Sequence, residues 1–186
     1  MAQPKPPQPV LLIVGMLSQD PALFDRADEA LTTDYGPLAC ASDLLDFSET
    51  HYYDAEMGHP LYRKFLAFAH AINPGQLPAI KHHTNRLEQD LAAANLDLPP
   101  AVPRPINLDP GYIEPSKLVL ATTKNYAHRI YIGDRIYAEI TLLFRHGRWQ
   151  PGLFTYSDYA SGRYDNFLNA ARQHLLEVLK SLKHPT

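Results

Sequence analysis

The sequence predicts an α+β fold: one domain with a strand-helix-strand opening and a mostly antiparallel sheet with a C-terminal hairpin, packed by about four helices. Three observations predict it. An unbroken apolar run at 10–14 is typical of a strand buried on both faces. Residues 130–140 alternate around a glycine-containing turn, as hairpins do. Beyond Asp165, apolar residues recur at helical spacing.

The opening consists of a strand, a helix and a second strand. Gly15 is expected to close the first strand. Asp20 is a good N-cap and stands before proline, so it predicts the start of a helix. A Gly-Pro pair at 36–37 ends that helix, and a strand is expected from about 38 to 47.

Two more helices are expected in the middle of the chain. Residues 61–68 favour a helix that breaks at 73–75, and another helix begins at Pro78. The apolar stripe of this second helix consists of Ile80, Leu87 and Leu91. A polar stripe beside it, spaced i, i+4 and i+7, consists of Lys81, Asn85 and Glu88.

The second half of the chain favours strands. Residues 106–109 predict a short strand closed by a Pro-Gly turn at 110–111, and 117–123 predict another. For the hairpin, a three-residue loop at 133–135 gives a better register than a loop of two, because it pairs Ile132 with Ile136. Ile130 then faces Ala138, Tyr131 faces Tyr137, and Arg129 faces Glu139. The polar face of the hairpin carries Arg129, Tyr131, Tyr137, Glu139 and Thr141.

Length, charge and cysteine content narrow the class of protein. A chain of 186 residues suits one domain, which we expect over 10–186 behind a flexible Pro-rich arm at 1–9. With 17 basic and 20 acidic residues there is no global basic field for nucleic acid or an anionic membrane, which leaves a local patch as the route to nucleic acid. One cysteine excludes an intrachain disulfide. Without a signal peptide or a long apolar run, we expect a cytoplasmic protein with no membrane partner.

Chemically active side chains gather in five stretches, and each has a structural interpretation as well. The loop at 50–56 displays binding groups or is simply solvated, and the polar helix stripe is part of a site or a solvated face. Asp109 either binds a metal or a hydroxyl group or forms a turn. Arg129 either binds phosphate or pairs with a neighbouring carboxylate. Asp158 either binds a ligand or caps a helix. On their chemistry, the expected catalytic carboxylates are Glu56, Glu88 and Asp109. The expected ligand-binding residues are Thr50, Tyr53, Lys81, Asn85, Lys124, His128, Arg129, Tyr131 and Glu139.

The chain lacks the P-loop, the dinucleotide-binding glycine motif and the nucleophile elbow. Four other blocks carry a resemblance: THYYDAEMG at 50–58, Lys81 with TNRLE at 84–88, NLDPGY at 107–112, and HRIY at 128–131. They resemble an uncharacterised bacterial family classed as a domain of unknown function, over nearly the whole chain after Val10. Some members of that family are automatically labelled GTP-binding protein, which implies a nucleotide ligand. The resemblance supplies no catalytic residues.

We expect the polar clusters to converge on one cleft over the polar face of the hairpin, because charged groups are costly to bury without partners. Cations beside Tyr rings suit a nucleotide or another phosphorylated small molecule, and carboxylates suit Mg²⁺. The expected reaction class is Mg²⁺-dependent phosphoryl or nucleotidyl transfer, or hydrolysis. The alternative is a non-enzymatic module that binds single-stranded RNA or a protein partner through an aromatic sheet face. That face consists of Tyr131, Tyr137, Tyr156 and Tyr159.

Overall fold

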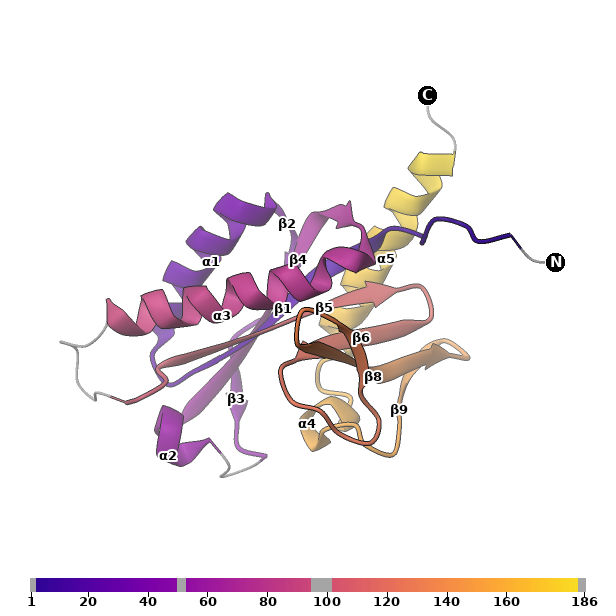
Figure 1. Cartoon of the computed structure of the whole chain (residues 1–186). Coiled ribbons are helices and arrows are strands. Elements are labelled where there is room, and N and C mark those ends of the chain that lie inside the picture. Colours follow the sequence, from indigo (N-terminus) through magenta and orange to yellow (C-terminus); the bar gives the residue numbers. More distant parts are fainter. Residues whose placement is uncertain (1–2, 50–52, 95–101, 184–186) are drawn as a thin grey trace.

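A computed structural model describes residues 3–49, 53–94 and 102–183 of the chain (Figure 1). None of the helices in these ranges is both long enough and apolar enough to cross a membrane. In chain order, the elements are β1 (Val10–Ser18), α1 (Pro21–Tyr35), β2 (Leu38–Ala41), β3 (Leu45–Phe47), α2 (Asp54–Met57), β4 (Leu61–Ile72), the 3-10 helix η1 (Pro74–Gln76), α3 (Leu77–Ala93), β5 (Ile106–Glu114), β6 (Lys117–Thr122), β7 (Ile130–Gly133), β8 (Ile136–Arg145), β9 (Arg148–Pro151), α4 (Ser157–Ala160) and α5 (Asp165–Lys183).

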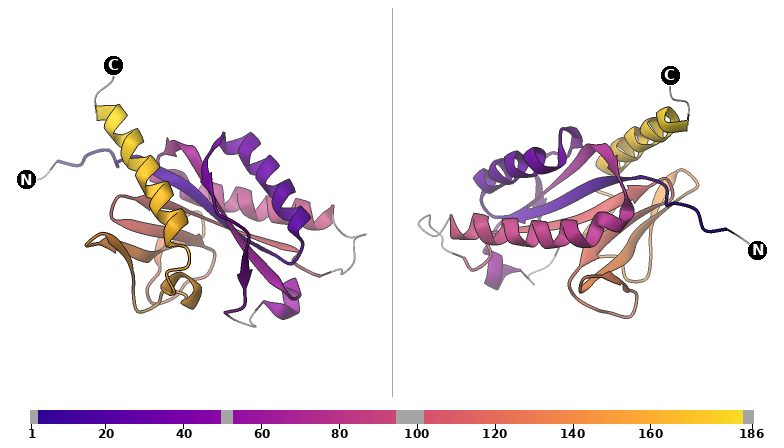
Figure 2. Two further views of the ribbon diagram at one scale, coloured as in Figure 1. Left: turned by 180° about the vertical axis from the view of Figure 1, so that it is seen from behind. Right: turned by 45° about the horizontal axis from the view of Figure 1, so that its top comes forward.

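One sheet holds all nine strands of the described residues. Its order is β2-β4-β1-β5-β6-β8-β7, with β3 also beside β4 and β9 beside β8. Every strand pair within the described ranges is antiparallel. Helices α1 and α3 cover one face and α5 covers the other (Figures 1 and 2). The α+β class predicted from the sequence is therefore confirmed.

The central strand β1 is buried along its whole length, because helices cover both faces of the sheet around it. Leu12 and Val14 face α1 and α3, whereas Leu11 and Ile13 face α5. The prediction that Gly15 closes the strand is wrong, since the strand continues to Ser18. Gly15 instead leaves room for a neighbouring side chain: a Cβ at this position would lie 3.0 Å from the Phe65 ring.

The helices with clear end signals are confirmed. Asp20 caps α1 by accepting a hydrogen bond from the backbone N–H of Ala22 at 2.9 Å, and Gly36 ends the helix with a φ of 87°. The apolar stripes predicted for α3 and α5 both face the core. The strand expected at 38–47 is split into the two short strands β2 and β3.

Two segments differ from their prediction, for related reasons. Residues 61–68 belong to the 12-residue strand β4 and not to a helix. Both faces of β4 are covered, so its apolar run shows no alternation and its spacing does not separate strand from helix. The turn expected at 110–111 is absent, because β5 continues through it to Glu114. Gly111 allows β5 to approach β6, where an added Cβ would lie 2.3 Å from the Val119 carbonyl oxygen.

In the β7–β8 hairpin, the predicted register is confirmed but the predicted loop length is not. Ile130 faces Ala138 and Tyr131 faces Tyr137, as predicted. The three-residue loop is wrong: Gly133 faces Ile136, and the turn consists of the two residues at 134–135, both with positive φ. A register shift between Tyr131 and Gly133 absorbs the extra residue, so the tyrosine pair and the tight turn coexist.

Candidate functional site

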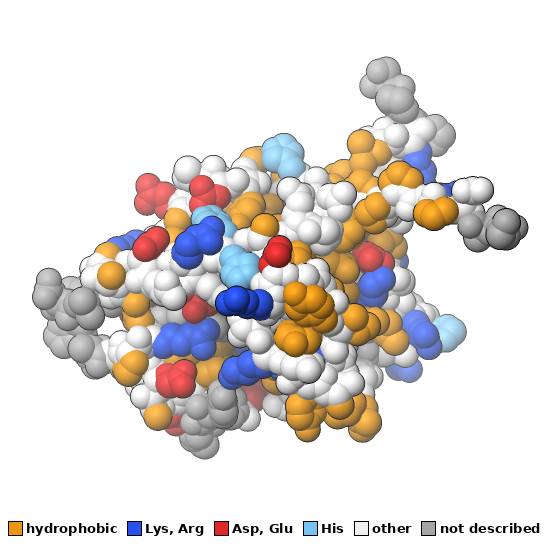
Figure 3. Space-filling view, viewed as in Figure 1, with side chains coloured by type: hydrophobic (Ala, Val, Ile, Leu, Met, Phe, Trp, Pro, Cys, Tyr) orange, Lys and Arg blue, Asp and Glu red, His pale blue; other side chains and the backbone are white. Residues whose placement is uncertain are grey.

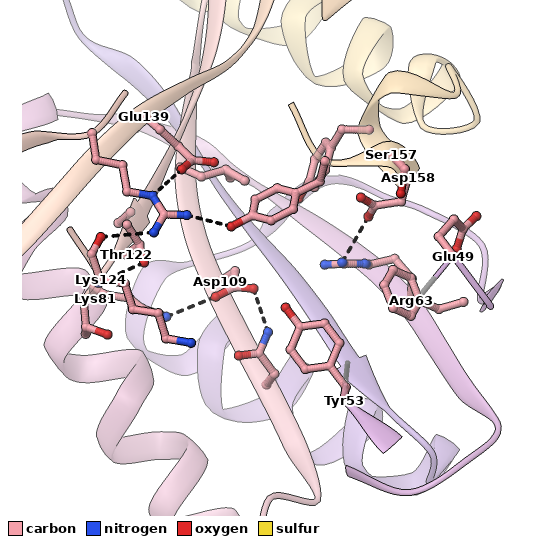
Figure 4. Close-up of a pocket in the computed structure, with 18 of the residues that line it drawn as sticks. Glu49, Tyr53, Arg63, Lys81, Asp109, Thr122, Lys124, Glu139, Ser157 and Asp158 are labelled. Atoms are coloured by element: carbon pink, nitrogen blue, oxygen red, sulfur yellow. Dashed lines mark hydrogen bonds and ion pairs between the residues drawn. The ribbon is translucent and has the colours of Figure 1, made fainter. Parts of the chain in front are cut away.

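A cavity of about 660 Å³ opens where β4, β5, β6 and β8 meet the start of α3 and the segment around α4. Figure 3 shows basic and acidic side chains lying beside one another on the face below α3. The close-up in Figure 4 shows side chains from these separate elements pointing toward one another. Seven residues predicted from the sequence line the cavity, namely Tyr53, Lys81, Asn85, Asp109, Lys124, Arg129 and Glu139.

The structure places the other predicted residues elsewhere. Glu56 is exposed on α2, and Tyr131 is exposed on β7; neither lines the cavity. Glu88 and His128 lie one layer behind the lining, in contact with residues that form it. Thr50 lies outside the described residues. The single cleft thus gathers part of the expected set.

Lys81 and Asp109 form the middle of the cavity wall. The Lys81 side chain is 5% exposed; its Nζ donates to the Leu108 carbonyl oxygen at 2.9 Å and lies 3.2 Å from Asp109 Oδ1. Asn107 Nδ2 donates to Asp109 Oδ2 at 2.6 Å. Burial alone would raise the pKa of Asp109, but the charges of Lys81 and Arg63 hold it below its ordinary value. Asp109 is therefore a carboxylate at neutral pH.

Glu88 braces the start of β5. Its Oε1 accepts the Leu108 N–H at 2.7 Å, and its Oε2 lies 3.1 Å from Arg104 Nη2. Arg104 also bonds to Asn107 Oδ1, so Glu88 reaches Asp109 through two side chains. Burial raises the pKa of Glu88 despite the cations Lys81 and Arg104. These contacts give Glu88 a positioning role.

Arg129 and Glu139 form a second ion pair across the hairpin. Arg129 Nε donates to Glu139 Oε2 at 2.6 Å, and His128 Nε2 lies 2.9 Å from the same oxygen. Arg129 also donates to the Lys124 carbonyl oxygen and, at 2.8 Å, to the Tyr156 hydroxyl. The predicted cross-strand pairing of Arg129 with Glu139 is present, and it holds Tyr156 at the cavity.

Arg63 forms a third pair at the far side. Its Nη2 lies 3.1 Å from Asp158 Oδ2, and both side chains are about 5% exposed. The Tyr164 hydroxyl donates to the same Asp158 oxygen at 3.0 Å. The guanidinium lies 5.0 Å from the Phe47 ring centre and 5.8 Å from that of Tyr159. Aromatic rings therefore surround this pair.

Sequence reasoning missed Arg63 because the helix expected at 61–68 gives it no sheet face. In a strand, alternate side chains point to the same face, so strand alternation would have placed Arg63 on the same face of β4 as Phe65. Arg104 was missed because it stands in a proline-rich crossing with no local pattern. Among the described residues, no group of three or more His, Cys, Asp or Glu side chains is arranged to hold a metal ion.

Comparison with protein families adds one finding. A family model described as "Domain of unknown function (DUF4416)" matches residues 8–175. The chain belongs to this family. All the residues that line the cavity lie inside the matched range, so the cavity is part of the DUF4416 domain itself. No curated protein and no solved structure matches the chain.

Proposed function

We propose that the cavity binds a nucleotide or another phosphorylated small molecule. The observation that carries this proposal is the gathering of five cations from four separate segments around one cavity that also has aromatic walls. Cations from separate segments meet only through the fold, and guanidinium and ammonium groups are the usual partners of phosphate. The cations are Arg63, Lys81, Arg104, Lys124 and Arg129.

The size and lining of the cavity suit such a ligand. Small-molecule sites usually measure about 300–1,000 Å³, and this cavity of about 660 Å³ falls within that range. Phe47, Tyr53, Tyr156 and Tyr159 provide flat surfaces for a ring. Burial, followed by the nearby charge of Asp109, raises the pKa of Tyr53 to about 12, so its phenol stays neutral at physiological pH.

Most of the charged side chains in the wall are already paired without a ligand. Lys81 is paired with Asp109, and Arg129 with Glu139. A bound phosphate would therefore replace part of the hydrogen bonding between each cation and its carboxylate. The carboxylates would lower the affinity for phosphate and restrict the position in which it binds. Asp109 lies beside Lys81, where an ionised oxygen ligand could share Mg²⁺ with the bound phosphates. This arrangement supports Mg²⁺-dependent phosphoryl or nucleotidyl transfer, or hydrolysis, as the reaction class we propose.

The proposal is tested by thermal denaturation with pyrophosphate, ribose 5-phosphate and a panel of nucleotides, each with and without Mg²⁺. A ligand present at 100 times its Kd stabilises the fold by about 2.7 kcal/mol. Lys124→Gln removes a charge at the cavity and should weaken binding. The matched control is Lys180→Gln on the exposed side of α5, which should leave binding unchanged. The absence of a shift with every ligand would contradict the proposal.

The alternative is a binding module for single-stranded RNA or a protein partner, and one observation favours it. Tyr131 is 59% exposed and meets Tyr137 edge to face, with ring centres 5.5 Å apart. Tyr159, however, is buried in the core, so the four-tyrosine face expected from the sequence is incomplete. Filter binding across a salt series tests this alternative, because RNA affinity should fall steeply as salt rises.

A further inference from the structure

The two ends of the cavity differ in charge. Figure 4 shows Lys81, Lys124 and Glu139 on one side of Asp109, and Arg63, Asp158 and Glu49 on the other. The first side, with Arg129, has three cations, and we call Lys81, Lys124 and Arg129 the phosphate end. The second side has one cation, paired with Asp158, while Glu49 is paired with Arg163. We call Phe47, Arg63, Asp158 and Tyr159 the neutral end.

The neutral end contains two hydrogen-bond donors without partners. Within the described ranges, neither the Arg63 Nε nor the Tyr159 hydroxyl has a hydrogen-bond partner. The two residues are 5% and 4% exposed and both line the cavity, while the two donor atoms themselves are fully buried just behind its surface. Buried donors in folded proteins are almost always satisfied, so two unpaired donors in one wall indicate that an acceptor belongs beside them.

The surroundings of these donors restrict that acceptor. The charge of Arg63 is already offset by Asp158, and Phe47 lies against the guanidinium. A second phosphate would bring uncompensated charge into this buried, aromatic end. A carbonyl oxygen on a flat ring brings an acceptor without charge and can stack on the aromatic walls. From the part of the chain that the structure describes, the Asp158 side chain accepts hydrogen bonds on Oδ2, from Arg63 and Tyr164.

We infer that the neutral end recognises a planar ring bearing a carbonyl oxygen, while the phosphate end holds the phosphate of the same ligand. When the ligand binds, the Tyr159 and Arg63 side chains turn toward the cavity and donate to the carbonyl oxygen, and Asp158 accepts from a ring N–H. This inference rests on the proposed function and deepens it in two ways. It orients the ligand in the cavity, and it selects nucleotides with an oxo-bearing base over those with an amino-bearing base.

The test compares inosine 5′-monophosphate with AMP by isothermal titration calorimetry. The two nucleotides differ at one ring edge, where inosine has a carbonyl oxygen and a ring N–H and adenosine has an amino group and a bare ring nitrogen. We expect inosine monophosphate to bind about tenfold more tightly. Tyr159→Phe should remove most of that preference by weakening inosine monophosphate, with little effect on AMP.

Tyr164→Phe is the matched control. Both tyrosine rings meet Phe65 edge-on, but the Tyr164 hydroxyl is bonded to Asp158 and Tyr164 does not line the cavity. Tyr164→Phe should lower the Tm of the ligand-free protein and keep the preference between the nucleotides. Tyr159→Phe should leave the Tm of the ligand-free protein unchanged or raise it, because it removes an unpaired donor.

The outcomes separate the inference from the proposed function. Failure of the nucleotides, pyrophosphate and ribose 5-phosphate to bind would overturn both. Equal binding of the two nucleotides, or a preference that survives Tyr159→Phe, would overturn the inference and leave the proposed function standing. A Tm loss in Tyr159→Phe as large as that in Tyr164→Phe would show that the Tyr159 hydroxyl is already bonded, and would also overturn it.

Discussion

Arg63 on β4 and Asp158 on α4 form an ion pair that is almost completely shielded from solvent, with Nη2 3.1 Å from Oδ2. The pair joins the central sheet to the short helix that borders the cavity, across 95 residues of sequence. A buried pair of this kind adds little net stability by itself, but removing one partner leaves an uncompensated charge. It therefore holds α4 in place more than it stabilises the fold.

Asp158→Ala should destabilise the protein by about 3–5 kcal/mol, because Arg63 would remain buried without its carboxylate. Urea denaturation measures the change. The double variant Asp158→Ala with Arg63→Met should recover part of the loss, since it also removes the stranded charge. A double variant less stable than Asp158→Ala alone would show that the guanidinium finds another partner.

Gly111→Ala should destabilise the protein more than a substitution this small usually does. The new Cβ would lie 2.3 Å from the Val119 carbonyl oxygen, so the β5 and β6 backbones would have to separate. We expect a loss of about 1–3 kcal/mol in the free energy of unfolding, measured in urea. Gly152→Ala is the control, because its nearest neighbour to a new Cβ is 3.8 Å away, and it should change stability by less than about 0.5 kcal/mol.

Asp109 should make stability depend on pH in acid. Its pKa is held below the ordinary value of 3.8, so its contribution is fully present above that value and is lost as pH falls through the lowered pKa. As the pH falls below about 5, the free energy of unfolding of Asp109→Asn should therefore decrease less than that of the parent protein. Urea midpoints at a series of pH values provide the measurement. Parallel pH profiles for the two proteins would contradict the assigned role of Lys81 and Arg63.

Glu139→Gln should weaken both the hairpin and ligand binding. Its Oε2 accepts from Arg129 and is in contact with His128, and the side chain is 4% exposed. Losing the charge should cost about 1.5–3 kcal/mol of stability, because hydrogen bonds to charged groups have this value. The released Arg129 should also hold Tyr156 less firmly, which reduces the ligand-induced Tm shift. An unchanged ligand-induced Tm shift would show that the Arg129–Glu139 pair does not contribute to ligand binding.

Part of the site follows from residue chemistry, and the rest follows from folding. Lys81, Asp109, Arg129 and Glu139 stand out in the sequence because charged side chains in or beside apolar strands and helices need partners. Arg63 did not stand out, because it is recognisable only once 61–72 is known to be a strand. Glu56 looked equivalent to the other carboxylates, yet α2 leaves it exposed.

The sequence by itself determined the α+β class, the helices α1, α3 and α5, and the hairpin register around Tyr131 and Tyr137. These features depend on caps, turns and periodicity that act within a few residues. Only the tertiary structure decided that 61–72 is a central strand, because a segment covered on both faces has no alternation to reveal it, and that the strand predicted at 106–109 continues to 114. The cavity also depends on the tertiary structure, because its ion pairs join residues that approach one another only after the sheet has formed.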